Sequence, residues 1–159
     1  MPIYDQSKRN ATADMVLGLR VDRATAVLPF TTHNLFTIVG GRVLLTGFLG
    51  EITVVMDAGA STLQITHLTT VVTAVVTPLT IATASVATLA VGRMVTLPAA
   101  VGSALTLSTG SSAALMNAVR YELKVGGLQL VVGGAANTGQ MKWSVWYVPV
   151  DDGAYMAAA

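Results

Sequence analysis

The sequence contains no cysteine and only two histidines. The lack of cysteine excludes a disulfide scaffold, a thiolate metal site and a cysteine nucleophile. Neither His33 nor His67 has a second metal-ligating residue at a spacing such as HxxxH. We therefore expect the protein to hold no metal and no cofactor.

Charged residues are also scarce. Nine basic and eight acidic side chains make up 11% of the 159 residues, against about 25% in ordinary soluble domains. The apolar fraction is 53% and the mean hydropathy is +0.65. This length suits one domain, whose surface must be covered by Thr, Ser, Gly and apolar groups or by a partner. The composition therefore predicts packing against copies of itself or against a larger protein shell.

The charges are unevenly distributed. Seven of the seventeen lie within residues 1–24, whereas the stretch between Ala24 and Val119 contains only Arg42, Glu51, Asp57 and Arg93. This contrast predicts an N-terminal arm, residues 1–24, followed by a single β-domain, residues 25–159, with a short Ala-rich C-terminal tail. The arm is either a solvated terminus or a segment that becomes ordered across a neighbouring subunit.

Nucleic acid and membranes are not expected partners. The net charge is +1, and no basic run extends beyond Lys8 and Arg9. The first residues lack the apolar core of a secretory signal, so we expect the protein to be made and used in the cytoplasm. The uncharged stretch from Ala58 to Gly92 is long enough to span a bilayer, but its many threonines and period-two alternation favour strands.

Short β-branched segments separated by Gly, Pro and Asp turns follow from Leu35 onward. In the segment 61–68, Leu63, Ile65 and His67 alternate with polar residues, which predicts a half-buried strand. His67 then shares the apolar face, where a buried imidazole with a satisfied hydrogen bond is the favoured interpretation.

Residues 120–133 form a hairpin candidate with its turn at Gly126 and Gly127. In the segment 141–150, Met141, Trp143, Val145 and Tyr147 alternate with Lys142, Ser144, Trp146 and Val148, so one tryptophan is expected in the core and the other at an interface or loop. Residues 112–119 are the one helix candidate. The predicted fold is all-β, an antiparallel β-sandwich or jelly-roll-like barrel with an extended N-terminal arm.

The evidence for catalysis is weak. Ser61, His67 and Asp57 can be combined on paper into a hydrolase triad, but the sequence has no GxSxG elbow. The glycine-rich stretches 40–47 and 133–139 do not match a phosphate-binding loop and are interpreted as turns. We therefore expect a protein that is not an enzyme.

Two segments, HNLFTIVGGRVLLTGFLGEITVVM at 33–56 and NTGQMKWSVWYVPVDDGAYMAAA at 137–159, together cover about a third of the chain. They resemble a family of small structural proteins of tailed bacteriophages, of the capsid decoration or cement type. The matching residues are Leu35, Phe36, Gly40, Gly41, Leu49, Gly50, Glu51, Trp143, Val145, Tyr147 and Pro149.

This resemblance implies a small β-domain on the capsid exterior that clamps neighbouring major capsid protein subunits as a dimer or trimer. Residues expected to bind the partner are Tyr4, Lys8, Arg9, Arg20, Arg23 and Trp146. The alternatives are another virion component, such as a head fibre, head completion protein or tail protein, and a small β-barrel enzyme or ligand-binding module.

Overall fold

The computed structural model describes residues 17–28, 30–71, 73–110, 112, 119–135 and 137–159. Within them it contains eleven elements, all of which are β-strands. They are β1 (Leu19–Leu28), β2 (Thr32–Val39), β3 (Val43–Val54), β4 (Thr62–Thr69), β5 (Val75–Pro78), β6 (Met94–Thr96), β7 (Thr106–Leu107), β8 (Tyr121–Leu123), β9 (Gly126–Gly133), β10 (Asn137–Pro149) and β11 (Tyr155–Ala158).

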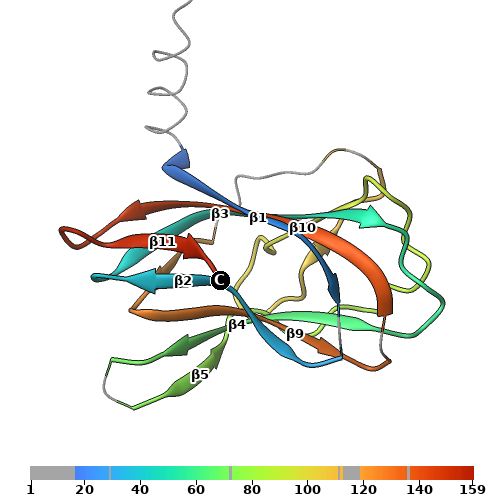
Figure 1. Ribbon diagram of the computed structural model, residues 1–159, viewed down its shortest axis with the longest axis horizontal. Coiled ribbons are helices and arrows are strands. Elements are labelled where there is room, and N and C mark those ends of the chain that lie inside the picture. Colours follow the sequence, from blue (N-terminus) through green and yellow to red (C-terminus); the bar gives the residue numbers. More distant parts are fainter. Residues whose placement is uncertain (1–16, 29, 72, 111, 113–118, 136) are drawn as a thin grey trace, which may run out of the picture.

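The strands form two antiparallel sheets that face each other (Figure 1). Sheet A has the order β1-β10-β3-β6-β7, with β8 pairing a second part of β3. Sheet B has the order β11-β2-β9-β4-β5. The predicted all-β sandwich is therefore confirmed.

The pairing is nested in the manner of a jelly roll. Strand β1 pairs with β10, β2 with β9, β3 with β8 and β4 with β5, so each pair encloses the next. The pairs alternate between the two sheets, giving β1-β10-β3-β8 in one sheet and β2-β9-β4-β5 in the other. This is the eight-strand order of two Greek keys. Strands β6, β7 and β11 are additions to it.

The core lies between the inner faces of the two sheets. Trp143 of β10 is 1% exposed and packs on Phe48 of β3, with ring centroids 5.2 Å apart. Met141, Val145 and Tyr147, which were expected to share one face of β10 with Trp143, all belong to the same buried cluster. The structure thus places the Trp143 face of this strand in the core, a choice that the period-two alternation left open.

Each tryptophan of β10 lies opposite a glycine of β3. Trp143 pairs with Gly50, and Trp146 pairs with Gly47. A Cβ on Gly50 would lie 2.7 Å from Cε3 of Trp143, and one on Gly47 would lie 3.1 Å from Cε3 of Trp146. The two glycines therefore provide the space into which the indole rings fold on opposite faces of sheet A.

Both ends of the predicted β-domain differ from expectation. Part of the predicted arm, Leu19–Ala24, belongs to β1, which pairs with β10 along sheet A. The charged residues of β1 lie on an edge strand, where water reaches them as it would reach an arm, so the charge pattern did not distinguish the two. The Ala-rich end is also not a free tail, because Tyr155–Ala158 forms β11 and pairs with β2.

The predicted hairpin of residues 120–133 is wrong. Strand β8 pairs with β3 in sheet A, whereas β9 pairs with β2 and β4 in sheet B. Gly126 and Gly127 are therefore the first residues of β9 and not a tight turn. The expected helix, 112–119, lies almost entirely outside the described residues.

The uncharged stretch from Ala58 to Gly92 contains strands β4 and β5, and its other described residues form turns, bends and irregular loops. Pro78 ends β5 at the edge of sheet B, as expected for a residue that cannot donate to a ladder. Among the described residues, no helix has the length and apolar character required to cross a membrane.

Candidate functional site

Ser61, His67 and Asp57, the residues considered as a hydrolase triad, are not brought together. Ser61 and His67 lie near opposite ends of β4, about 20 Å apart for an extended chain. His67 is 8% exposed, and its Nε2 lies 2.9 Å from the carbonyl oxygen of Lys124. Burial lowers the pKa of His67, although this hydrogen bond opposes the effect. The imidazole is thus buried and hydrogen-bonded, as predicted.

Ser61 and Asp57 instead hold loops together. The Ser61 hydroxyl donates to the carbonyl oxygen of Ala135 at 2.8 Å and accepts a hydrogen bond from the amide of Asn137. Asp57 accepts hydrogen bonds from the backbone of Gly59 and Thr138, which lower its pKa. These bonds join the turn before β4 to the start of β10.

His33 of β2 lies near Arg23 of β1. Burial and the charge of Arg23 both lower the pKa of His33. Its Nε2 has no hydrogen-bond partner among the residues that the structure describes. Within the described part of the chain, no group of three or more His, Cys, Asp or Glu residues is arranged to hold a metal ion.

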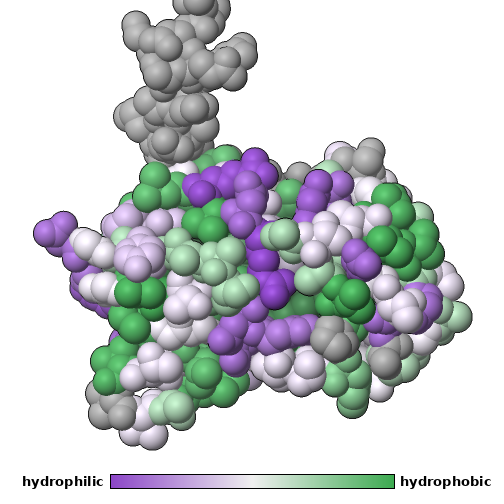
Figure 2. All heavy atoms as spheres, in the orientation of Figure 1, coloured by the Kyte–Doolittle hydropathy of each residue, from purple (hydrophilic) through white to green (hydrophobic). Residues whose placement is uncertain are grey.

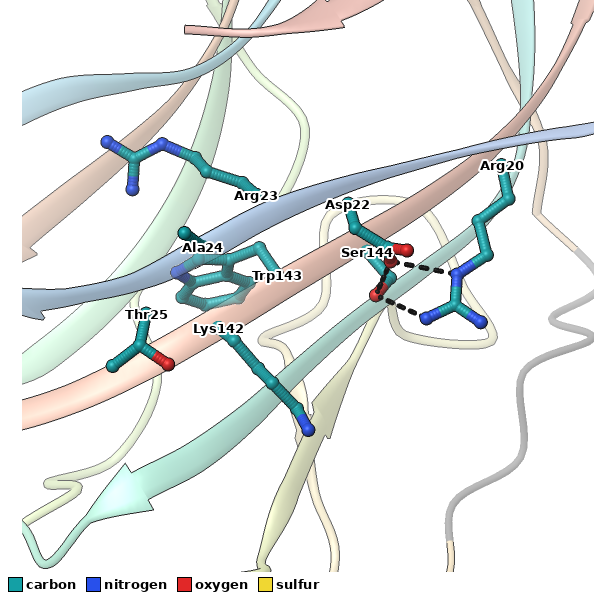
Figure 3. Close-up of a pocket in the computed structure, with 8 residues that line it drawn as sticks. All are labelled: Arg20, Asp22, Arg23, Ala24, Thr25, Lys142, Trp143 and Ser144. Atoms are coloured by element: carbon teal, nitrogen blue, oxygen red, sulfur yellow. Dashed lines mark hydrogen bonds and ion pairs between the residues drawn. The ribbon is translucent and has the colours of Figure 1, made fainter.

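The most developed polar arrangement lies on the outer face of sheet A. Arg20 and Asp22 of β1 form an ion pair with an N–O distance of 2.8 Å. The hydroxyl of Ser144 on β10 donates to Asp22 at 2.6 Å and accepts from Arg20 at 3.4 Å, as the dashed lines in Figure 3 show. Partial burial raises the pKa of Asp22, but the bonds from Ser144 and Arg20 outweigh it, and the net pKa is lowered.

Trp146 lies beside this triangle. The guanidinium carbon of Arg20 is 5.2 Å from the centroid of its ring, which is a cation–π geometry. One row further along the sheet, Lys142 of β10 pairs with Glu51 of β3 at 2.8 Å. Positive and negative side chains therefore alternate on this face.

A shallow hollow of about 350 Å³ opens between β1 and β10 (Figure 3). Arg20, Asp22 and Ser144 line it on one side, and Arg23 and Lys142 lie further along. Arg23 donates to the backbone oxygen of Ala159 at 3.3 Å, which ties the edge of sheet A to the end of the chain.

The structure brings together two of the residues expected to bind a partner, since Arg20 and Trp146 are in contact. Arg23 lies on the same strand but opposite Trp143, so it is on the other face of β1 and reaches the backbone of Ala159. The other three, Tyr4, Lys8 and Arg9, lie outside the described residues. Sequence reasoning missed Asp22 and Ser144 as members of this surface, because their proximity depends on the pairing of β1 with β10.

A second ionic network ties one end of the sandwich together. Arg42 at the start of β3 makes bidentate contacts with Asp151 and also pairs with Glu122 of β8 at 2.8 Å. The backbone N–H of Arg42 donates to the same Asp151 carboxylate at 2.7 Å. The guanidinium of Arg42 lowers the pKa of Asp151 to about 2.

Replacing Asp151 with asparagine is expected to lower the melting temperature at pH 7 by a few degrees. The pKa of Asp151 is below its ordinary value of 3.8, so its ionised form stabilises the fold above that pH, and this contribution is lost as the pH falls towards 2. Thermal melts of wild type and D151N should therefore converge between about pH 4 and pH 2. The neighbouring D152N variant is the control, and a pH-independent gap for D151N would contradict this assignment.

Large parts of the surface have no formal charge. The segments 58–92 and 94–119 contain no Asp, Glu, Lys or Arg. Their large exposed apolar side chains, among the described residues, are Val71, Val75, Val76, Ile81, Val91 and Val101.

Comparison with known proteins gave no matching family model, no matching curated protein and no matching solved structure.

Proposed function

We propose that this protein is a structural component of a tailed-bacteriophage virion, assembled in the host cytoplasm, which decorates the capsid exterior. In this proposal it binds between major capsid protein subunits as a small oligomer and stabilises the shell. The observation that carries the proposal is the distribution of charge on a rigid sandwich. Charged side chains are grouped on sheet A, while the long segments 58–92 and 94–119 expose valine and isoleucine without charge.

The resemblance of segments 33–56 and 137–159 to decoration proteins supports the same function. The jelly-roll order is compatible with it, but jelly rolls also occur in lectins and enzymes, so the fold alone does not decide. On a capsid, affinity comes from the repetition of the same contact at many equivalent positions. Many modest contacts around a closed lattice hold a shell together without one very tight interface.

Sheet A offers the surface that suits a specific contact. Arg20, Asp22, Ser144 and Trp146 are held in place by one another, so little side-chain entropy is lost when a partner covers them. Arg and Trp are also the residue types that dominate binding energy in interfaces. Residues 1–16, which include Tyr4, Lys8 and Arg9, come shortly before β1 in the sequence.

The experiment that tests the proposal is cosedimentation with expanded, undecorated capsids. The purified protein should pellet with the capsids in a saturable manner and raise their resistance to heat or osmotic shock. A protein that stays in the supernatant at every protein and salt concentration contradicts the proposal.

Deleting residues 1–16 is expected to weaken capsid binding by at least about tenfold while the melting temperature stays close to that of the full chain. The reason is that β1, the first strand of the sandwich, begins at Leu19 and remains complete. Arg20→Glu should also weaken pelleting, whereas Arg120→Glu, which makes the same charge change elsewhere, should not. Unchanged binding by both the deletion and R20E would exclude this part of the surface.

A second virion role is favoured by the same charge-poor surface, which would equally suit a head fibre, head completion or tail component. Copy number separates these roles. Hundreds of copies per particle indicate decoration, and a number set by a neck or tail ring indicates the alternative. Quantitative mass spectrometry of purified virions measures this directly.

A further inference from the structure

The hairpin of β4 and β5 exposes an apolar edge. Strand β5 is one of the two outer strands of sheet B, and it pairs with β4 on one side only. All four of its residues are exposed, and Val71, Val75 and Val76 have 57, 50 and 55% of their surfaces accessible. Figure 1 shows this hairpin projecting from the body, and Figure 2 shows apolar residues over it. Both faces of β5 are therefore uncovered.

The backbone of β5 has a free hydrogen-bonding side. The N–H of Leu79 donates to the carbonyl oxygen of Ile65 on β4, so Leu79 faces β4. In an antiparallel pair, successive residues point their backbone N–H and C=O groups alternately toward and away from the partner strand. The backbone groups of Thr77 and Val75 therefore also point toward β4. Val76 and Pro78 then direct their backbone groups outward. Proline has no N–H to lose, which fits its place on the outward side.

Exposed edges are usually guarded by charges, bulges or proline. Strand β1, the outer strand of sheet A, has Arg20, Asp22 and Arg23 and two register shifts. Strand β5 has Pro78 alone, and the whole hairpin from Thr62 to Pro78 contains no Asp, Glu, Lys or Arg. The outward backbone groups of Val76 are thus open to pairing with another strand.

We propose that this edge pairs with the β5 edge of a second copy of the chain, antiparallel and about a two-fold axis at Val76. The Val76 N–H of each copy then donates to the Val76 carbonyl of the other, and the two B sheets become one continuous sheet. A two-fold interface places each residue close to its own symmetry mate, so charges near the axis repel. A hairpin without charge meets this condition, which favours a second copy over a charged partner.

This inference deepens the proposed function, because decoration calls for a small oligomer. The role given to the dimer rests on that proposed function. The contact is limited to one hairpin per copy, so we expect self-association in the micromolar range. The test uses the free protein without capsids, so its failure would leave the capsid-binding proposal untouched.

Sedimentation velocity of the full chain from about 1 to 200 µM should show a monomer–dimer equilibrium. Val76→Lys places two like charges across the axis and should raise the dissociation constant at least about tenfold. Val101→Lys is the matched control, since Val101 is 74% exposed in a different loop. A monomer at all concentrations, a trimer, or equal dimerisation of V76K and wild type would each overturn the proposal.

A cysteine variant locates the contact. The chain has no cysteine, so Val76→Cys introduces a single thiol. Opposed residues of an antiparallel pair have Cα atoms about 5.5 Å apart, within the range that a disulfide spans. Mild oxidation should therefore cross-link V76C into dimers several times faster than V101C. Equal cross-linking rates for the two variants would overturn the proposed register.

Discussion

Replacing Trp143 with alanine is expected to lower the free energy of unfolding by about 3–5 kcal/mol. The indole is 1% exposed, and it packs on Phe48 in the middle of the sandwich. Its removal takes the largest fully buried side chain out of the core and leaves a cavity that two rigid sheets cannot close. Urea denaturation followed by far-ultraviolet circular dichroism measures the loss.

Trp146→Ala is the matched control for this prediction. Trp146 is 9% exposed, but it lies on the outer face of sheet A, beneath Arg20 and outside the main buried cluster. Its replacement should therefore cost clearly less stability than W143A. Because the chain has two tryptophans, each variant keeps one indole as a fluorescent probe of its own side of the sheet. Equal losses for the two variants would show that the core is not centred on Trp143.

Replacing Gly50 with alanine is expected to destabilise the fold by about 1–3 kcal/mol, because the new methyl group overpacks the core. The added Cβ would lie 2.7 Å from Cε3 of Trp143 and 2.8 Å from Cε of Met141, so one of the three must shift. Gly110→Ala is the control, since no atom lies within 4 Å of the Cβ that it adds. Chemical denaturation of both variants gives the comparison.

A double-mutant cycle sharpens this second prediction. In a Trp143→Leu background the ring that blocks the methyl group is absent, so Gly50→Ala should cost much less than in wild type. The coupling free energy between the two positions should then be about 1 kcal/mol or more. Strictly additive losses would show that Gly50 is required for its backbone conformation and not for the space that it leaves to the indole.

Patterns confined to one strand were predictable from the sequence. The shared burial of Leu63, Ile65 and His67 on β4 follows from period-two alternation, which is a local property. The same alternation separates the two faces of β10, but which of them lies in the core depends on how the sheets pack. The glycines of β3 illustrate the limit. Their spacing of three residues equals that of Trp143 and Trp146, but the correspondence is visible only once the strand pairing is known.

The errors arose where distant strands override local signals. Gly126 and Gly127 have the composition of a tight turn, yet the backbone of Leu68 and the side chain of Asn34 lie against them in sheet B. Because these glycines have no side chains, the neighbouring strands can approach them closely, and the chain does not reverse at this point. The arm boundary failed for a related reason, because the charges of an edge strand look like those of a solvated terminus.

The outer face of sheet A was partly predictable. Arg20, Arg23 and Trp146 were singled out by residue type, and the structure places Arg20 on the ring of Trp146. Arg23 lies opposite Trp143 and therefore on the other face of β1. Ser144 and Asp22 gave no signal of their own, since a serine and an aspartate become partners only through the pairing of β1 with β10. The exposed valines of β5 were hidden in a long apolar stretch whose exposure the sequence does not reveal.

The nested pairing of strands also sets the order in which the protein is expected to fold. Among the strands that pair with each other in the described part of the chain, β4 and β5 are joined by the shortest loop, so this hairpin has the smallest loop-closure entropy and should form first. The pairs β3–β8, β2–β9 and β1–β10 then close progressively longer loops. Strand β1 must wait until β10 has left the ribosome, so a chain truncated before Asn137 cannot complete sheet A. Refolding should consequently be slow for a domain of this size.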